Sequence, residues 1–317
     1  MKTTVEFMKT DRVLSFENIQ MVCKRSSLLQ RFLPMFGFGR ENLRLIIPGR
    51  IDLRPGITLL VGESGSGKSV FLSLLAGYPL ANALVSVGSF CVAGKPAKWL
   101  TTRELSAVIF SRGVQRAFKG VPRFFLPQKF PEVTQGGVQV GDVLLLLVDG
   151  LLGSECVTRT REEKINCLND LLVRAGLEDK WKSEFTQLSG GERQRIELLA
   201  RFAVMKLSNA KQMILLLDEP TTGLDIKNAQ KFYVLLNTLL KEVHYASAVI
   251  ATHDLLTCPQ SESYPLIIAK KRCHSEISIT QYNSACDFIQ VRQSDVRIIW
   301  RMVYDRLQEE KDENVAF

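Results

Sequence analysis

The feature that most constrains this 317-residue chain is the segment 62–69, which reads Gly-Glu-Ser-Gly-Ser-Gly-Lys-Ser. Residues 57–61 before it are apolar and partly β-branched, which predicts a buried strand, and residues 70–77 after it predict a buried helix that ends at a glycine. A G-x-x-x-x-G-K-S segment between a strand and a helix is typical of a phosphate-binding loop, because glycines let the backbone turn tightly around phosphate oxygens at a helix start. We therefore expect a phosphate site formed by Gly62, Glu63, Ser64, Gly65, Ser66, Gly67, Lys68 and Ser69.

Two further predicted strands end in chemically active residues. The run 213–217 is followed by Asp218 and Glu219, and the run 247–251 is followed closely by His253. Strands that alternate with helices predict a parallel sheet covered on both faces, and such sheets bind ligands at the carboxyl ends of their strands. We expect Lys68 to reach the β- and γ-phosphates and Ser69 and Asp218 to hold Mg²⁺. Glu219 would then activate water, and His253 would contact the γ-phosphate.

Each of these assignments has a simpler alternative. The Asp-Glu pair at 218–219 could cap the next helix, and His253 could be an ordinary structural histidine. The net charge of +8 suits nucleic acid or an anionic membrane surface, but it also suits a protein that binds nucleotide phosphates. Seven cysteines without a C-x-x-C pair favour reduced thiols over disulfides or a metal site. The first twelve residues are polar and the longest apolar run is 143–148, so neither an export signal nor a membrane span is expected.

The remaining pattern predicts an N-terminal strand over 13–22, a second over 45–53 and a third over 83–92. The segment 138–185 is mostly helical in pattern and is followed by a long helix over 193–205 and another over 226–242. Two strands, 265–270 and 276–280, predict a hairpin. An amphipathic pattern after Ser294 predicts a terminal helix; we expect it to pack on this domain or on a dimer mate, and the alternative is a helix that recognises another partner.

Five motifs in a fixed order resemble those of the ATP-binding cassette (ABC) ATPases. They are the Walker A loop at 62–69, the Q-loop residue Gln128, the signature Leu-Ser-Gly-Gly-Glu at 188–192, the Walker B strand at 214–218 with Glu219, and the switch residue His253. A D-loop at 222–225 completes the set. The resemblance implies an α/β P-loop core, an antiparallel β-subdomain and a helical subdomain. It places the ATP-binding domain at 13–282, with the helical subdomain at about 129–187, an insertion at about 24–44 and a C-terminal extension at 283–317.

The resemblance also implies how the site works. The family forms a head-to-tail dimer, so Ser189, Gly190 and Gly191 would contact ATP bound to the other subunit, with Asp225 beside them. Gln128 would join Ser69 and Asp218 around Mg²⁺, and it would share the catalytic site with Lys68, Glu219 and His253. The leading hypothesis is a transporter ATPase that lies at the inner face of the membrane on a separate permease. The alternative is a soluble ABC ATPase that acts on nucleic acid, the ribosome or another complex.

Two local features refine this hypothesis. The Walker A variant is similar to those of peptide importers, whereas the signature and switch segments are similar to those of lipoprotein-release and macrolide-export ATPases. The family also has an adenine-stacking aromatic after the first strand, a position where this chain has Cys23. Either an aromatic residue of the insertion, for which we propose Phe36 or Phe38, covers the adenine instead, or the adenine is held more loosely.

Overall fold

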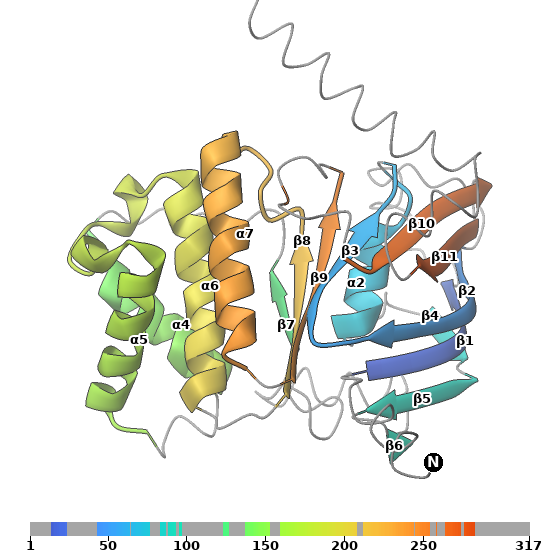
Figure 1. Cartoon of the computed structure of the whole chain (residues 1–317), viewed down its shortest axis with the longest axis horizontal. Helices are drawn as coiled ribbons and strands as arrows, with labels where there is room; N and C mark the ends of the chain where they lie inside the picture. The colour runs from blue at the N-terminus through green and yellow to red at the C-terminus, as the bar shows by residue number, and fades with distance from the viewer. Residues whose placement is uncertain are drawn as a thin grey trace, which may run out of the picture.

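The computed structural model describes fourteen segments of the chain. They are residues 14–23, 43–63, 65–76, 83–86, 88–92, 95–96, 123–126, 137–152, 159–207, 212–243, 245–253, 258, 264–273 and 276–282. Within these residues the chain forms a single eleven-stranded sheet with helices on both sides of its parallel part (Figure 1). Within the same residues, no helix is both long and apolar enough to span a membrane.

The parallel part of the sheet positions the site. It consists of β10 (Leu266–Cys273), β3 (Gly56–Val61), β9 (Tyr245–Thr252), β8 (Gln212–Asp218) and β7 (Arg123–Leu126), in that order. The registers align the carboxyl ends: Val61 lies opposite Thr252, and Asp218 lies opposite Ala251. The segments that follow β3, β8 and β9 therefore leave the sheet at nearly the same level.

The antiparallel part carries the N-terminal strands. It contains β1 (Leu14–Cys23), β2 (Leu43–Leu53), β4 (Ala83–Ser86), β5 (Ser89–Val92) and β6 (Lys95–Pro96). The strand β11 (Glu276–Tyr282) joins the two parts, because it pairs antiparallel to β10 and parallel to β2. The amide of Gln281 adds two further bonds to β2: Asp52 N–H donates to Gln281 Oε1 at 2.7 Å, and Gln281 Nε2 donates to the Asp52 carbonyl at 2.9 Å.

The single strand predicted over 83–92 is wrong, because the structure divides it into β4 and β5. Both pieces pair with β1, but β1 has an irregularity between Glu17 and Ile19, and Asn18 adopts φ 52°. Gly88 faces this bulge, and its N–H donates to the Glu17 carbonyl at 3.1 Å. A Cβ at Gly88 would come within 3.1 Å of Asn18 Cβ, so the close approach of the turn to the bulge favours glycine at this position.

The helices cover the parallel strands in two layers. The helix α2 (Lys68–Ala76) lies between the parallel strands and the antiparallel strands, and α7 (Ile226–Lys241) and α6 (Gly190–Leu207) lie on the opposite side (Figure 1). The alternating residues Ile57, Leu59 and Val61 of β3 belong to the same buried cluster as α6 and α7. Burial on both faces explains why the central strands are almost uninterruptedly apolar.

The helical segment beyond α6 consists of α4 (Val140–Leu152) and α5 (Arg161–Ala175). Thr160 and Glu163 form a capping box at the start of α5, and Gly176 ends the helix with φ 63°, where a non-glycine residue would be strained. Leu168, Leu171 and Leu172 are buried, as the helical periodicity predicts. The helix predicted over 193–205 begins three residues earlier, at Gly190, because Ser189 caps it.

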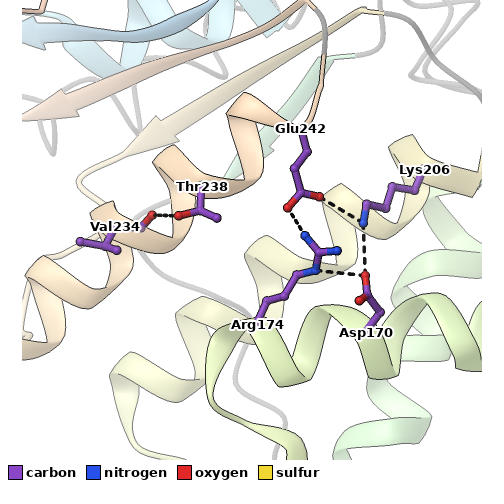
Figure 2. Close-up of polar contacts among 6 residues, drawn as sticks. All are labelled: Asp170, Arg174, Lys206, Val234, Thr238 and Glu242. Carbon is purple, nitrogen blue, oxygen red and sulfur yellow. Dashed lines mark hydrogen bonds and ion pairs between the residues drawn. The ribbon is translucent and has the colours of Figure 1, made fainter.

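A ring of four charged side chains joins α5 to the far ends of α6 and α7 (Figure 2). Arg174 Nε lies 3.1 Å from Asp170 Oδ2, and its Nη1 contacts Glu242 Oε1. Lys206 Nζ completes the ring at 3.3 Å from Asp170 Oδ2 and 3.4 Å from Glu242 Oε2. A single surface ion pair contributes little to the free energy of folding, because ordering two long side chains costs entropy. In a closed ring each ordered side chain makes two ion pairs. The ring therefore ties the helical segment to the core helix α7.

Candidate active site: a phosphate-binding loop with an ionised glutamate

The loop between β3 and α2 wraps around the side chain of Lys68. Lys68 Nζ donates to the carbonyl oxygens of Gly62 at 2.8 Å and Glu63 at 3.2 Å, and the side chain is buried. Burial lowers the pKa of Lys68 below its ordinary value, and the nearby Glu219 and Asp218 carboxylates oppose that shift. A desolvated ammonium group at a helix start is suited to bind an anion.

Close packing requires glycine at positions 62 and 67 of this loop. A Cβ at Gly62 would lie 2.3 Å from the Ala269 carbonyl oxygen, and one at Gly67 would lie 2.3 Å from Ile277 Cδ1. Gly65 and Gly67 also have positive φ values of 74° and 91°. Ser66 Oγ is buried without a hydrogen-bond partner in the described part of the chain. A narrow, backbone-lined cradle with an unpaired hydroxyl fits phosphate oxygens.

The packing at Gly67 gives a direct prediction. Gly67→Ala suffers both the positive φ and the overlap with Ile277, whereas Gly65→Ala suffers the positive φ alone, since nothing lies within 4 Å of its Cβ position. We expect Gly65→Ala to lower the free energy of unfolding by about 1–2 kcal/mol. Gly67→Ala should lower it by the same amount and, because of the overlap, by a further ~1–3 kcal/mol. Ile277→Val removes the overlapping Cδ1 and should recover part of the second loss. Urea unfolding without nucleotide measures all three; equal losses at the two glycines would contradict the packing argument.

The carboxylates at the end of β8 face this loop. The Ser69 hydroxyl donates a hydrogen bond to Asp218, but burial dominates and raises the pKa of that carboxyl, with the Glu219 charge adding to the shift. A divalent cation would favour the charged form of Asp218. A hydroxyl beside a half-buried carboxylate supplies the hard oxygen ligands that Mg²⁺ prefers, so the residues present fit that ion.

Glu219 is held in one position by two neighbours. His253 Nδ1 lies 3.2 Å from Glu219 Oε1, and the Thr222 hydroxyl donates to Oε2 at 3.2 Å. The hydrogen bond from His253 is the main reason that the pKa of Glu219 lies below its ordinary value, so the carboxyl is ionised near neutral pH. Its backbone has φ 47°, which is uncommon for a residue other than glycine and often marks a functional position. A structural histidine would make the same ion pair, so the γ-phosphate contact of His253 and the role of Glu219 as the base stay predictions.

The signature and D-loop residues form a second group. Ser189 and Gly190 are exposed at the start of α6, and Gly190 and Gly191 lie against Leu224, with Asn228 also next to Gly191. Asp225 caps α7 by accepting the Asn228 N–H at 2.9 Å, and Asn228 Nδ2 donates to its other oxygen. Among the described residues, no hydrogen bond or ion pair links this group to Lys68.

Several predicted site residues lie outside the described residues. They are Gln128, Ser64, residues 24–42 of the predicted insertion with Phe36 and Phe38, and the extension at 283–317; residues 43–44 belong to β2. The sequence missed the role of Thr222 as a second partner of Glu219; its place three residues after the carboxylate, in a turn, is the signal that could have found it. The described geometry is that of a P-loop nucleotide-binding protein in which the carboxylate of Glu219, the predicted base, is ionised.

Comparison with known proteins specifies the family. Residues 51–222, more than half of the chain, match the family described as ABC transporter. The lipoprotein-releasing system ATP-binding protein LolD of Pseudoalteromonas translucida is 31% identical over 77% of this chain and 88% of LolD. The peptidoglycan transport ATP-binding protein YejF of Agrobacterium fabrum is 35% identical over 64% of this chain. The chain spans 34% of YejF and 31% of a macrolide export ATP-binding/permease protein MacB from Bartonella quintana.

Solved structures show the same fold. The ADP conformation of MJ1267, an ATP-binding cassette of an ABC transporter, superposes with a TM-score of 0.57 at 19% identity, covering 92% of this chain and 98% of that one. The dimeric post-hydrolysis state of the cassette MJ0796 with ADP and Pi gives a TM-score of 0.55 at 22% identity, covering 85% and 98%. The chain belongs to the ABC transporter family. The predicted P-loop α/β fold and the predicted enzyme class, an ATPase, are confirmed.

Proposed function

We propose that this chain hydrolyses ATP at the interface of a head-to-tail dimer and thereby drives a separate membrane permease. The observation that carries the proposal is the constellation at the strand ends: an ionised Glu219 held by His253 and Thr222, close enough to Lys68 and Asp218 for their charges to interact. Ser69, Asp218 and Gln128 would hold Mg²⁺, which would supply positive charge to neutralise the phosphates. Glu219 accepts the proton of the attacking water, and His253 keeps that carboxylate ionised and oriented.

The dimer is supported by a glycine that one chain alone does not need. A Cβ at Gly190 would meet only Leu224 Cδ2, at the ordinary contact distance of 3.8 Å, and Gly190 has no positive φ. Packing within one subunit therefore leaves room for a side chain at this exposed position. Glycine becomes necessary if the γ-phosphate of an ATP on the partner subunit must approach the start of α6 closely, where the first backbone N–H groups have no intrahelical partner.

The transporter role is supported by the relatives. LolD, YejF and MacB are all named for release, transport or export, and this favours a permease over nucleic acid or another soluble complex as the partner. A chain that works through a permease would lie peripherally at the inner face of the membrane. The substrate and the direction of transport belong to that permease.

One experiment tests the partner directly. Tagged Glu219→Gln protein is incubated with ATP and recovered from detergent-solubilised membranes and from cytosol of its own cells. We expect a stoichiometric integral membrane protein that is lost in matched Lys68→Ala protein, because that variant does not bind the phosphates. Recovery of ribosomes, nucleic acid or a soluble complex instead would reject the transporter role while leaving the ATPase in place.

A further inference from the structure

The last residue of the signature carries a negative charge at the start of α6. Glu192 Oε2 accepts hydrogen bonds from the Ser189 backbone N–H and from the Ser189 hydroxyl, both at 2.9 Å. The Glu192 N–H donates in return to Ser189 Oγ at 3.3 Å, which makes a reciprocal cap. Burial alone would raise the pKa of Glu192, but the hydrogen bonds from Ser189 and Lys180 outweigh it, so the carboxyl is ionised.

This cap conflicts with the proposed task of the segment. The γ-phosphate of ATP is an anion, and it would approach Ser189, Gly190 and Gly191 while the Glu192 carboxylate is bonded to Ser189 itself. Like charges at such short range repel, and they repel more strongly once a dimer interface excludes water. The signature segment therefore needs a cation nearby if it is to accept a phosphate without penalty.

Lys180 is placed to supply that cation. Its Nζ lies 3.3 Å from Glu192 Oε1, the oxygen that Ser189 does not use, and its side chain is about one-third exposed. The short 3-10 turn Glu178–Lys180 fixes its backbone, because Lys180 N–H donates to the Leu177 carbonyl and Ser183 N–H donates to the Lys180 carbonyl, both at 3.0 Å. Asp179 lies farther from Lys180 Nζ, at 3.9 Å, and is mostly exposed, so it competes only weakly with Glu192 for the Lys180 charge.

Two arginines follow Glu192 but are differently placed. The Arg193 guanidinium lies over the Phe185 ring, 5.3 Å from its centroid. Arg195 is buried, and burial lowers its pKa while the Glu192 charge opposes that shift, so the two groups interact at longer range. Within the described residues, Lys180 makes the ion pair with Glu192.

We propose that Lys180 is a positioning residue of the shared ATP site: by pairing with Glu192 it neutralises the start of α6, so that the signature can receive the γ-phosphate of ATP on the partner subunit. The inference rests on the proposed head-to-tail site. Lys180 acts through Glu192, and the phosphate loop of its own subunit binds ATP without it.

The first test separates the shared site from the phosphate loop. Lys180→Met keeps the aliphatic stem and removes the charge, Lys180→Arg restores a charge, and Lys182→Met is a matched control on an exposed lysine two residues away. We expect Lys180→Met to raise KM for ATP hydrolysis about tenfold, the order of one partly desolvated charge interaction. It should leave kcat, thermal stability and ATP binding by monomers near wild type. Lys180→Arg should recover most of the loss, and Lys182→Met should behave as wild type.

The second test asks whether Lys180 acts through Glu192. Glutamine at 192 keeps an oxygen for Ser189 but carries no charge, so Lys180→Met should have little effect when added to Glu192→Gln. A full additional loss in the double variant, an unchanged KM in Lys180→Met, or a lower melting temperature with weaker monomer binding would each overturn the inference. ATP-induced dimerisation of Glu219→Gln protein is measured alongside: if that dimer fails to form even with Lys180 intact, the proposed shared site is itself wrong.

Discussion

Replacing Glu219 by glutamine is expected to reduce ATP hydrolysis to about one per cent of the wild-type rate or less, because general-base catalysis contributes ~10²–10⁴-fold. Glutamine keeps the size of the side chain and one acceptor oxygen for His253, and its NH2 group can donate to the Thr222 hydroxyl, but it cannot take a proton from water. The backbone at φ 47° is strained equally in both proteins. ATP should still bind and should trap a dimer, and phosphate release in a single turnover with size-exclusion chromatography measures both effects.

The matched control for this variant is Thr222→Val, which removes one hydrogen bond from Glu219 and leaves its carboxylate and the contact with His253 in place. We expect this control to lose no more than about tenfold in rate, because Thr222 is exposed and the net contribution of one such hydrogen bond is about 0.5–1.5 kcal/mol. Residual hydrolysis by Glu219→Gln above a tenth of wild type would remove Glu219 from the role of base.

The sequence predicts those parts of the fold that depend on local pattern. The strands β3, β8 and β9 are short apolar runs followed by polar residues, and α5 has a periodic face with a capping box before it and a glycine after it. The break between β4 and β5 could not be predicted in this way. It lies at the contact between Gly88 and the bulge at Asn18, which are 70 positions apart in the sequence.

The same distinction applies to the site. Walker A, Walker B and the signature are contiguous segments, so their residues are visible in the sequence. The groups that hold them are distant: Ile277 packs against Gly67, His253 binds Glu219, and Lys180 pairs with Glu192 across twelve positions. Only the sheet register and the turn at 178–180 bring these partners together, and neither has a sequence motif.

The shared site predicts that two inactive proteins regain activity when they are mixed. Lys68→Ala removes the cation that binds phosphate, and Gly190→Asp places a carboxylate where the γ-phosphate must approach. Gly190→Asp should fold, because the Cβ position is open and an acidic residue in the first turn favours the helix dipole. Each variant alone should therefore be folded and inactive, which circular dichroism and phosphate release establish before mixing.

In a mixed dimer one ATP site contains both substitutions, Lys68→Ala from one subunit and Gly190→Asp from the other. The second site combines an intact phosphate loop with an intact signature. Random pairing makes about half of the dimers mixed, each with one good site, so the recovered activity should approach roughly a quarter of wild type under mass action.

Mixing the Lys68→Ala/Gly190→Asp double variant with wild type is the matched control. Those mixed dimers contain no intact site if ATP is shared across the interface, but they keep one if each chain acts alone. Activity of Gly190→Asp by itself, or wild-type activity that is not reduced by an excess of the double variant, would reject the shared site, because either result means that one subunit completes its own catalytic site.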